Sequence, residues 1–220
     1  MDQKSAAGLV ITENERALVE LSHRIQANPE LGFQEERASV WLAEILSDAG
    51  FKVELGLCDL PTAFRATYGS GPLNIAICAE YDALPGIGHA CGHNIIAAMA
   101  IGAAVGAAKV ADHAGITVTV IGTPAEEVGD AGGKVLLLER GAFDGVHAAM
   151  MVHPAPMDVD LPAIIAASTF DIQYTGKAAH AQERSFHHVR PASLGLPLLH
   201  RPSASANAAY RCVGRARGAF

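Results

Sequence analysis

The stretch NIAICAEYDALPGIGHACGHNIIAAMAIGAA, residues 74–104, contains in one run the signals of a strand, a polar turn and a helix. Its first residues are nearly all apolar up to Glu80, which is typical of a strand buried on both faces. A turn rich in glycine, histidine and cysteine follows, and an apolar helix is expected from about residue 90 to 110. A buried strand that leads into a helix in this way predicts a layered α/β domain.

The same alternation of strands and helices continues on both sides of this stretch. Residues 12–28 and 35–49 are predicted helices, and the first is expected to begin at the capping box Thr12-Glu13-Asn14-Glu15 and to end before Pro29. A short helix is predicted over residues 131–140. The further predicted strands are FKVELGL (51–57), AFRATYG (63–69), TVTVIGTPAEE (117–127) and HAAMMVHP (147–154). This order predicts a mainly parallel sheet with helices on both faces.

The composition excludes several classes of protein. Half of the 220 residues are apolar and 18% are charged, which is typical of a globular chain. The formal net charge of −7, without a basic stripe in the patterned part of the chain, argues against a nucleic-acid partner. The apolar run over residues 95–108 is shorter than the ~20 residues that cross a bilayer, so no membrane partner is expected. The N-terminus shows no secretory leader, and we therefore expect a cytoplasmic protein whose four cysteines are thiols.

Polar residues gather where each predicted strand ends. Glu80 and Asp82 follow the first buried strand, and the pair Glu126-Glu127 follows the second. The third strand ends at His153, and three further candidates open the helix after the glycine-rich turn, namely His89, Cys91 and His93. Ligands of such sheets bind beyond the carboxyl ends of the strands, so we expect these side chains to share one site.

The residue types in this set indicate a metal. The spacing of Cys91 and His93 is by itself a weak signal, because a buried thiol and a backbone-bonded histidine would look the same. Adjacent carboxylates such as Glu126 and Glu127 repel each other unless a cation compensates them. One of them can bind the metal while the other accepts a proton, and His153 adds a nitrogen. A Cys91 nucleophile with His93 as its base is a rival interpretation that leaves the carboxylate pair unexplained.

Five segments, in order, resemble a known family. ANPELGFQEERAS, AEYDALPGIGHACGHN, GTPAEEVGDAGGK, HAAMMVHP and FDIQYTGKAAHA are similar to the zinc-dependent amidohydrolase and aminoacylase-like metallopeptidases of peptidase family M20. Within that family they are most similar to the branch of auxin-conjugate hydrolases, aminobenzoyl-glutamate hydrolases and β-alanyl-lysine-type dipeptidases. The resemblance covers residues 12 to about 182.

The resemblance implies roles for the candidate residues and two divalent metal ions, Zn²⁺ with Mn²⁺ or Co²⁺ as alternatives. It implies that Glu126 is the general base and that Asp82 orients the site. The resemblance assigns no clear role to His89, which is expected to be a hydrogen-bonded histidine of the fold or beside the site and not a ligand. Glu80 stands where peptidase branches carry a ligand histidine, and Asn94 where many amidohydrolases carry Asp. The implied metal ligands are Cys91, which bridges the two ions, His93, Glu127 and His153.

The resemblance also implies a domain organisation. Residues 1–165 are expected to be the N-terminal part of a zinc-exopeptidase-like catalytic domain. Residues 166–183 would begin an α+β lid, whose histidine, here His180, reaches the active site of the partner subunit in a homodimer and acts in catalysis by stabilising the tetrahedral intermediate. Residues 184–220 hold six of the eleven Arg and no acidic residue, and they are interpreted either as an out-of-frame segment or as a disordered basic tail.

Two functions follow as expectations. The first is a hydrolase that uses a metal-activated water to cleave the amide bond of N-acyl amino acids or small dipeptides. The family is nearly twice as long and supplies one more metal-binding histidine after the lid. The second expectation is therefore a truncated, inactive metal-binding relative or dimer partner.

Overall fold

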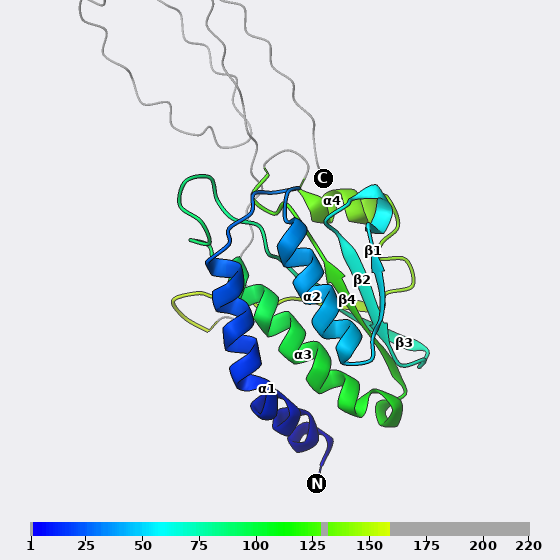
Figure 1. The fold of residues 1–220 in the computed structure, drawn as a ribbon. Coiled ribbons are helices and arrows are strands. Elements are labelled where there is room, and N and C mark those ends of the chain that lie inside the picture. Colours follow the sequence, from blue (N-terminus) through cyan, green and yellow to red (C-terminus); the bar gives the residue numbers. More distant parts are fainter. Residues whose placement is uncertain (1, 129–131, 159–220) are drawn as a thin grey trace, which may run out of the picture. The chain divides into compact units, whose positions relative to one another are not determined.

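The computed structural model describes residues 2–128 and 132–158, which form one five-stranded sheet with helices packed on it (Figure 1). The strands lie in the order β1-β2-β4-β3-β5. Their bounds are β1 Lys52–Leu55, β2 Phe64–Tyr68, β3 Leu73–Ala79, β4 Ile116–Gly122 and β5 Ala148–Met150. The helices are α1 Gln3–Gln26, α2 Glu36–Asp48, α3 His93–Ala114 and α4 Gly133–Glu139, with a 3-10 turn at Leu57–Asp59.

The α/β prediction with helices on both faces is confirmed, but the sheet, expected to be mainly parallel, is mixed, with two parallel and two antiparallel pairings. β3 pairs in parallel with both β4 and β5, as expected of strands joined by helical crossovers. β1 and β2 form an antiparallel edge against β4. The connection between β1 and β2 contains only the short 3-10 turn, which is too short for a parallel crossover.

The start of the first helix differs from the prediction. α1 begins at Gln3, because the Asp2 carboxylate accepts a hydrogen bond from the Ser5 amide at 2.8 Å and caps the helix. Thr12, the predicted cap, lies inside the helix and its hydroxyl donates to the Gly8 carbonyl at 3.1 Å. The capping-box prediction is therefore wrong, whereas the end of the helix before Pro29 is confirmed.

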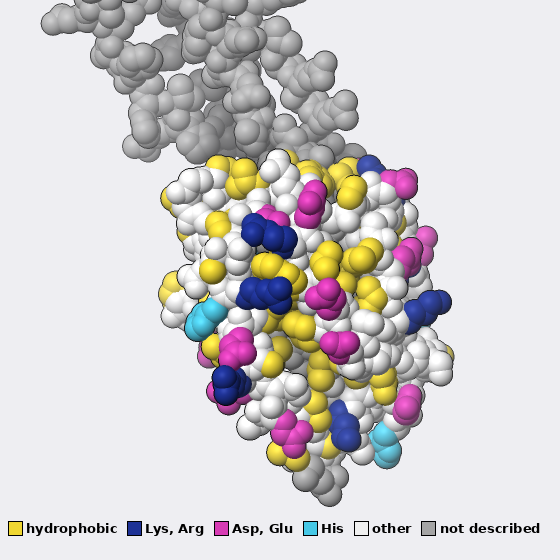
Figure 2. Space-filling model, in the orientation of Figure 1, with side chains coloured by type: hydrophobic (Ala, Val, Ile, Leu, Met, Phe, Trp, Pro, Cys, Tyr) yellow, Lys and Arg dark blue, Asp and Glu magenta, His cyan; other side chains and the backbone are white. Residues whose placement is uncertain are grey.

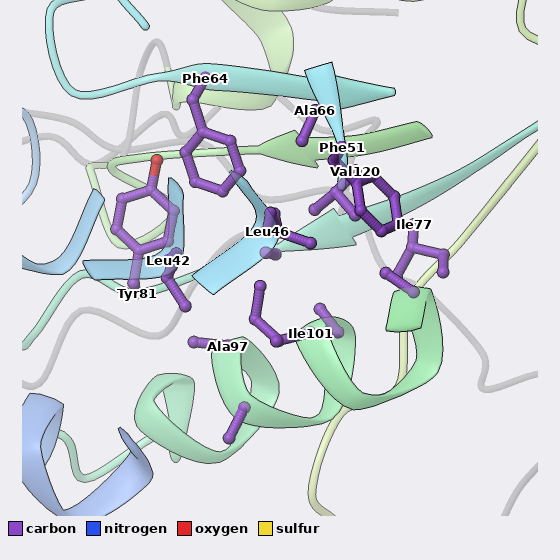
Figure 3. Packing of buried hydrophobic residues seen from close by; sticks show 14 of the residues in the cluster. Leu42, Leu46, Phe51, Phe64, Ala66, Ile77, Tyr81, Ala97, Ile101 and Val120 are labelled. Atoms are coloured by element: carbon purple, nitrogen blue, oxygen red, sulfur yellow. The ribbon is translucent and has the colours of Figure 1, made fainter. Parts of the chain in front are cut away.

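The main core lies between the sheet and the helices α2 and α3. Figure 3 shows Leu42 and Leu46 of α2 facing Ala97 and Ile101 of α3 beneath the strands. The sheet contributes Phe64, Ala66, Ile77 and Val120 to this core. Each large side chain buried here contributes about 1.5–3 kcal/mol. This packing fixes where α3 begins, and so where the glycine-rich turn lies.

A second, smaller core lies on the opposite face of the sheet. Ala76 and Ile121 point there because side chains alternate along a strand, and Leu137 of α4 covers them. α4 is thereby held against the sheet close to the ends of β3 and β4.

α3 is a core helix. Its 22 residues, with a mean hydropathy of 1.7 over the most apolar window, would be long and apolar enough to cross a membrane. In this structure α3 packs against α1, β3 and β4, and 56% of that window is buried. On the face of the molecule drawn in Figure 2, Lys, Arg, Asp and Glu side chains are interspersed with apolar ones. Core packing accounts for the hydrophobicity of α3.

Candidate metal centre

The structure brings most of the predicted site residues together at one edge of the sheet. Glu80 and Asp82 follow the end of β3, and the Glu126-Glu127 turn follows the end of β4. His93 is the first residue of α3, and His153 follows β5. The parallel order of β4, β3 and β5 places these carboxyl ends side by side.

The orientation of His93 is set by the turn before it. Gly92 precedes the helix with φ of +82°, a left-handed conformation that glycine adopts freely. A Cβ at Gly92 would lie 3.1 Å from Pro154 Cγ, so the turn also packs closely against the segment after β5. His93 Nδ1 lies 2.9 Å from both Asp82 Oδ1 and the Asp82 carbonyl oxygen. Because both are acceptors, Nδ1 carries a proton and donates it to Asp82.

The other nitrogen of the same ring faces a group of carboxylates. His93 Nε2 is buried, has no hydrogen-bond partner, and lies 3.6 Å from Glu80 Oε2. It also lies 3.8 Å from Glu126 Oε2 and 3.8 Å from Glu127 Oε1. Ligand atoms around a tetrahedral zinc ion are roughly 3.4 Å apart, given bonds of about 2.1 Å. The spacing therefore suits a cation held between these atoms better than direct hydrogen bonds.

Two overlapping groups of side chains could each hold a metal ion. One is Glu80, His93 and His153, and the other is His93, Glu126 and Glu127. Within each group the candidate ligand atoms lie within 4.8 Å of one another. The groups share His93, and together they contain three of the four predicted ligands and the predicted base. Asp82 supports them by accepting from His93 and from the Glu127 amide, the latter at 2.9 Å.

Sequence reasoning placed Glu80 at this edge without a ligand role, and it missed Lys134. Glu80 stands in place of a histidine and was not predicted to be a ligand, but its carboxylate is 1% exposed and its Oε2 has no hydrogen-bond partner. Lys134 of α4 forms an ion pair with Glu80 Oε1. The position of Glu80 at the end of a buried strand could have indicated a ligand. The role of Lys134 could not be read from the sequence, because its partner is 54 residues away.

The charges of the centre shift the pKa values of its groups. Burial would lower the pKa of His93, but the Asp82 hydrogen bond and the charges of Asp82 and Glu80 outweigh it and raise that pKa. Burial raises the pKa of Glu126, helped by the charges of Glu80 and Glu127 and opposed by Lys134. The centre therefore favours positive charge beside His93, which a bound cation would also supply, and the raised pKa makes Glu126 a better proton acceptor.

Cys91 lies beside the two groups and belongs to neither among the described residues. Interaction with the Glu127 carboxylate raises the pKa of its thiol to about 11, with burial as a smaller cause. The thiol thus interacts with a predicted ligand, and the bridging role that the family resemblance implies stays a prediction.

The remaining histidines differ in their placement. His153 is exposed, and its Nδ1 lies 2.8 Å from the Pro154 carbonyl oxygen, while its ring meets the His93 ring edge-on at 6.2 Å. Both nitrogens of His89 lack a hydrogen-bond partner, and burial lowers the pKa of this side chain. His89 is in neither ligand group. His180, together with residues 166–183 and 184–220, lies outside the described residues.

These features define an α/β metal-binding domain with its candidate ligands at the carboxyl edge of the sheet. The sequence profile of Peptidase family M20/M25/M40 matches residues 76–195, more than half of the chain. The chain belongs to this family, as the five motifs indicate.

Individual relatives agree with this assignment. An Xaa-Arg dipeptidase of Mus musculus is 38% identical over 193 residues, which cover 81% of this chain and 44% of the relative. A component of the p-aminobenzoyl-glutamate hydrolase of Escherichia coli K12 is 34% identical over 66% of this chain and 34% of its own length. The crystal structure of Bacillus subtilis YxeP, described as a dinuclear metal binding peptidase of the M20 family, matches with a TM-score of 0.55 and 29% identity, over 69% of this chain and 45% of YxeP. The chain spans less than half the length of these relatives.

Proposed function

We propose that this chain is the N-terminal part of the catalytic domain of a metal-dependent hydrolase that cleaves the amide bond of N-acyl amino acids or small dipeptides. The observation that carries the proposal is the unpartnered Nε2 of His93, buried among the carboxylates of Glu80, Glu126 and Glu127. Family membership supports the reaction class. The dipeptidase and aminobenzoyl-glutamate hydrolase relatives support small amides as substrates.

The proposed cofactors are two divalent ions, with Zn²⁺ first and Mn²⁺ or Co²⁺ as alternatives. Imidazole nitrogens, carboxylate oxygens and a neighbouring thiol form the mixed donor set that zinc accepts, and the high share of oxygen also suits manganese. His93, Glu127, Glu80 and His153 would hold the ions, and Cys91 would be the bridging ligand that the family resemblance implies.

The chemistry that divalent ions supply in such a site is a water of lowered pKa and a polarised substrate carbonyl. Glu126 accepts the proton of the attacking water at its carboxylate and passes it to the leaving amine. Its raised pKa and 40% exposed side chain suit this exchange with substrate. Asp82 keeps the Nδ1 proton of His93 in place, so that Nε2 offers a lone pair to the centre.

Glu126→Gln tests the assignment of the general base. Glutamine keeps the size of the side chain but cannot accept the proton, so amide hydrolysis should fall by about 10²–10⁴-fold. The bound metal, measured by atomic emission, should stay near the wild-type content. The substrates are a panel of N-acyl amino acids and β-alanyl dipeptides, assayed with this chain and with a chain to which a family C-terminal half is restored. Retained turnover in the variant would refute the role of Glu126.

A second candidate function is a catalytically inactive metal-binding relative or dimer partner. Such a protein would hold a metal ion in the two ligand groups without turning over an amide. Metal binding without turnover by this chain, together with turnover by the restored chain, supports this alternative. Homodimerisation and the role of His180 stay predictions.

We propose a cytoplasmic location as well. Cys58, Cys78 and Cys91 are free thiols within the part of the chain that the structure describes, which suits a reducing compartment. Fractionation of cells that express the tagged protein would test it.

A further inference from the structure

We infer that Glu35 is a positioning residue that holds the backbone of the Glu126-Glu127 turn in the conformation the metal centre needs. The inference rests on the proposed function in one respect, the assignment of these two carboxylates to the centre. It concerns a residue from the N-terminal segment, far from the turn in sequence and without a place in either ligand group.

Glu35 is buried completely and uses both of its oxygens. Its Oε1 accepts a hydrogen bond from the Ala125 amide at 2.7 Å, and its Oε2 accepts one from the Thr62 hydroxyl at 2.9 Å. The Thr62 carbonyl in turn accepts from the Tyr81 hydroxyl at 2.6 Å. The described residues contain no Lys or Arg in a salt bridge with Glu35. Two hydrogen-bond donors therefore hold a buried carboxylate that lacks a cationic partner.

This arrangement is not explained by the helix that Glu35 precedes. Glu35 stands at the N-cap of α2, but its side chain makes no capping hydrogen bond there. Burial raises the pKa of the Glu35 carboxyl, because it disfavours the charged form. A carboxylate in this position is therefore unfavourable unless hydrogen-bond donors compensate for its lost hydration. The side chain turns away from α2 and toward the end of β4.

The bond to Ala125 has a specific conformational consequence. Ala125 is fully buried and has φ of +57°, a left-handed conformation that residues with a Cβ rarely adopt. Glu35 accepts the one hydrogen bond that the Ala125 amide donates among the described residues. Without Glu35, this buried amide would lose that acceptor. Such a conformation persists only where the surrounding structure over-determines it.

Two side-chain carboxylates bind backbone amides of the turn. Glu35 accepts from the Ala125 amide, and Asp82 Oδ2 accepts from the Glu127 amide at 2.9 Å. Glu126 lies between the two, so the directions of both carboxylates depend on this pair of bonds. Asp82 also binds His93, which ties one end of the turn to the histidine ligand. Glu35 is the matching anchor at the other end.

The test compares three variants of the chain. Glu35→Leu removes both acceptors at similar volume, and Glu35→Gln keeps an oxygen for Ala125 while its amide can donate to the Thr62 hydroxyl. Thr62→Val is the matched control, because it removes the donor to Oε2 and leaves the bond to Ala125. The measurements are hydrogen-deuterium exchange of a peptide that contains residues 123–127 without added metal, and Zn²⁺ affinity by calorimetry.

We expect Glu35→Leu to speed exchange in the 123–127 peptide and to weaken Zn²⁺ binding by about 10–100-fold. Glu35→Gln and Thr62→Val should stay within about threefold of the wild-type affinity, a difference of roughly half a power of ten. If Glu35→Leu does not fold, Glu35→Asp takes its place, because its shorter side chain cannot reach both donors.

Three results would overturn the inference. One is wild-type exchange and wild-type affinity in Glu35→Leu. Another is a uniform loss of protection over the whole chain with an unchanged Zn²⁺ affinity, which would mark a purely structural residue. The third is a loss of Zn²⁺ affinity in Thr62→Val that is as large as the loss in Glu35→Leu. A wild-type chain that does not bind zinc contradicts the proposed function alone, since the exchange measured without metal still decides the role of Glu35.

Discussion

At the scale of residues, the two nitrogens of His93 have different roles: one fixes the orientation of the ring, and the other faces the candidate metal position. Nδ1 is bound to Asp82, and Nε2 lies among carboxylates without a hydrogen-bond partner. Glu80 divides its oxygens in the same way, with Oε1 paired to Lys134 and Oε2 turned toward His93. Each of the two residues is thus held by one atom and offers the other to a cation.

Lys134→Met should lower stability and strengthen the response to metal. Removal of one partner of a buried ion pair costs about 3–5 kcal/mol, and we expect about 1–3 kcal/mol here because the Lys134 side chain is 36% exposed. The freed Glu80 carboxylate adds negative charge to the centre, so the rise in Tm on addition of Zn²⁺ should be larger than in the wild type. Calorimetric unfolding with and without Zn²⁺ measures both effects.

Lys134→Arg is the control for this prediction, because it keeps the charge and should keep both quantities near their wild-type values. An equal fall in Tm with and without Zn²⁺ in Lys134→Met would contradict a coupling between Lys134 and the metal centre.

At the scale of elements, α4 is packed directly against the turn that carries the paired glutamates. The Gly133 amide donates to the Ala125 carbonyl at 3.3 Å, and a Cβ at Gly133 would lie 1.9 Å from the Pro124 carbonyl oxygen. The absence of a side chain at Gly133 lets α4 begin where Lys134 can reach Glu80.

Gly133→Ala should therefore destabilise the chain by about 1–3 kcal/mol, as overpacking usually does. The clash is with backbone, which cannot move without shifting α4 or the turn. Gly8→Ala in α1 is the matched control: a Cβ there has no atom within 4 Å, so better helix propensity should raise stability by up to about 1 kcal/mol. Urea unfolding followed by circular dichroism compares the two. A stabilised Gly133→Ala would show that the contact is easily relieved.

At the scale of the whole molecule, the described part has a packed core on each face of the sheet and also exposes apolar surface. The edge strand β5 is exposed, with Met150 55% accessible. A groove of about 970 Å³ lies between α1 and α3, lined largely by apolar side chains such as Leu18, Ile95 and Met99. Stability of a domain of this size is a small difference between large terms, so a bound ion contributes noticeably to it.

Metal removal should accordingly lower the unfolding temperature. Zn²⁺ at about 100 times its Kd stabilises the folded state by about 2.7 kcal/mol, which corresponds to roughly 5–10 °C for a chain of this length. Differential scanning calorimetry before and after EDTA treatment measures the loss, and readdition of Zn²⁺ should reverse it. His93→Gln is the control and should show little response to EDTA. A wild-type Tm that is independent of EDTA would contradict a metal centre at His93.

Much of the architecture could be predicted from local patterns. The described strands match their predicted segments, with β3 and β4 each beginning one residue earlier, because buried strands leave apolar runs bounded by polar turns. The helix end before Pro29 follows in the same way. The start of α1 was missed because the Asp2 cap precedes a weakly patterned first turn, and Thr12 offered a stronger local signal. The antiparallel edge was missed because strand patterns do not state their pairing partner.

The sequence by itself determined the elements of this protein and the polar residues that end its strands, since both follow from neighbours along the chain. It also indicated the family. Only the tertiary structure decided that Nε2 of His93 faces the carboxylates, that Lys134 pairs with Glu80, and that Glu35 binds an amide 90 residues away. Such contacts depend on strand order and on the packing of helices onto the sheet, and no local pattern encodes the distance between two segments once they are folded together.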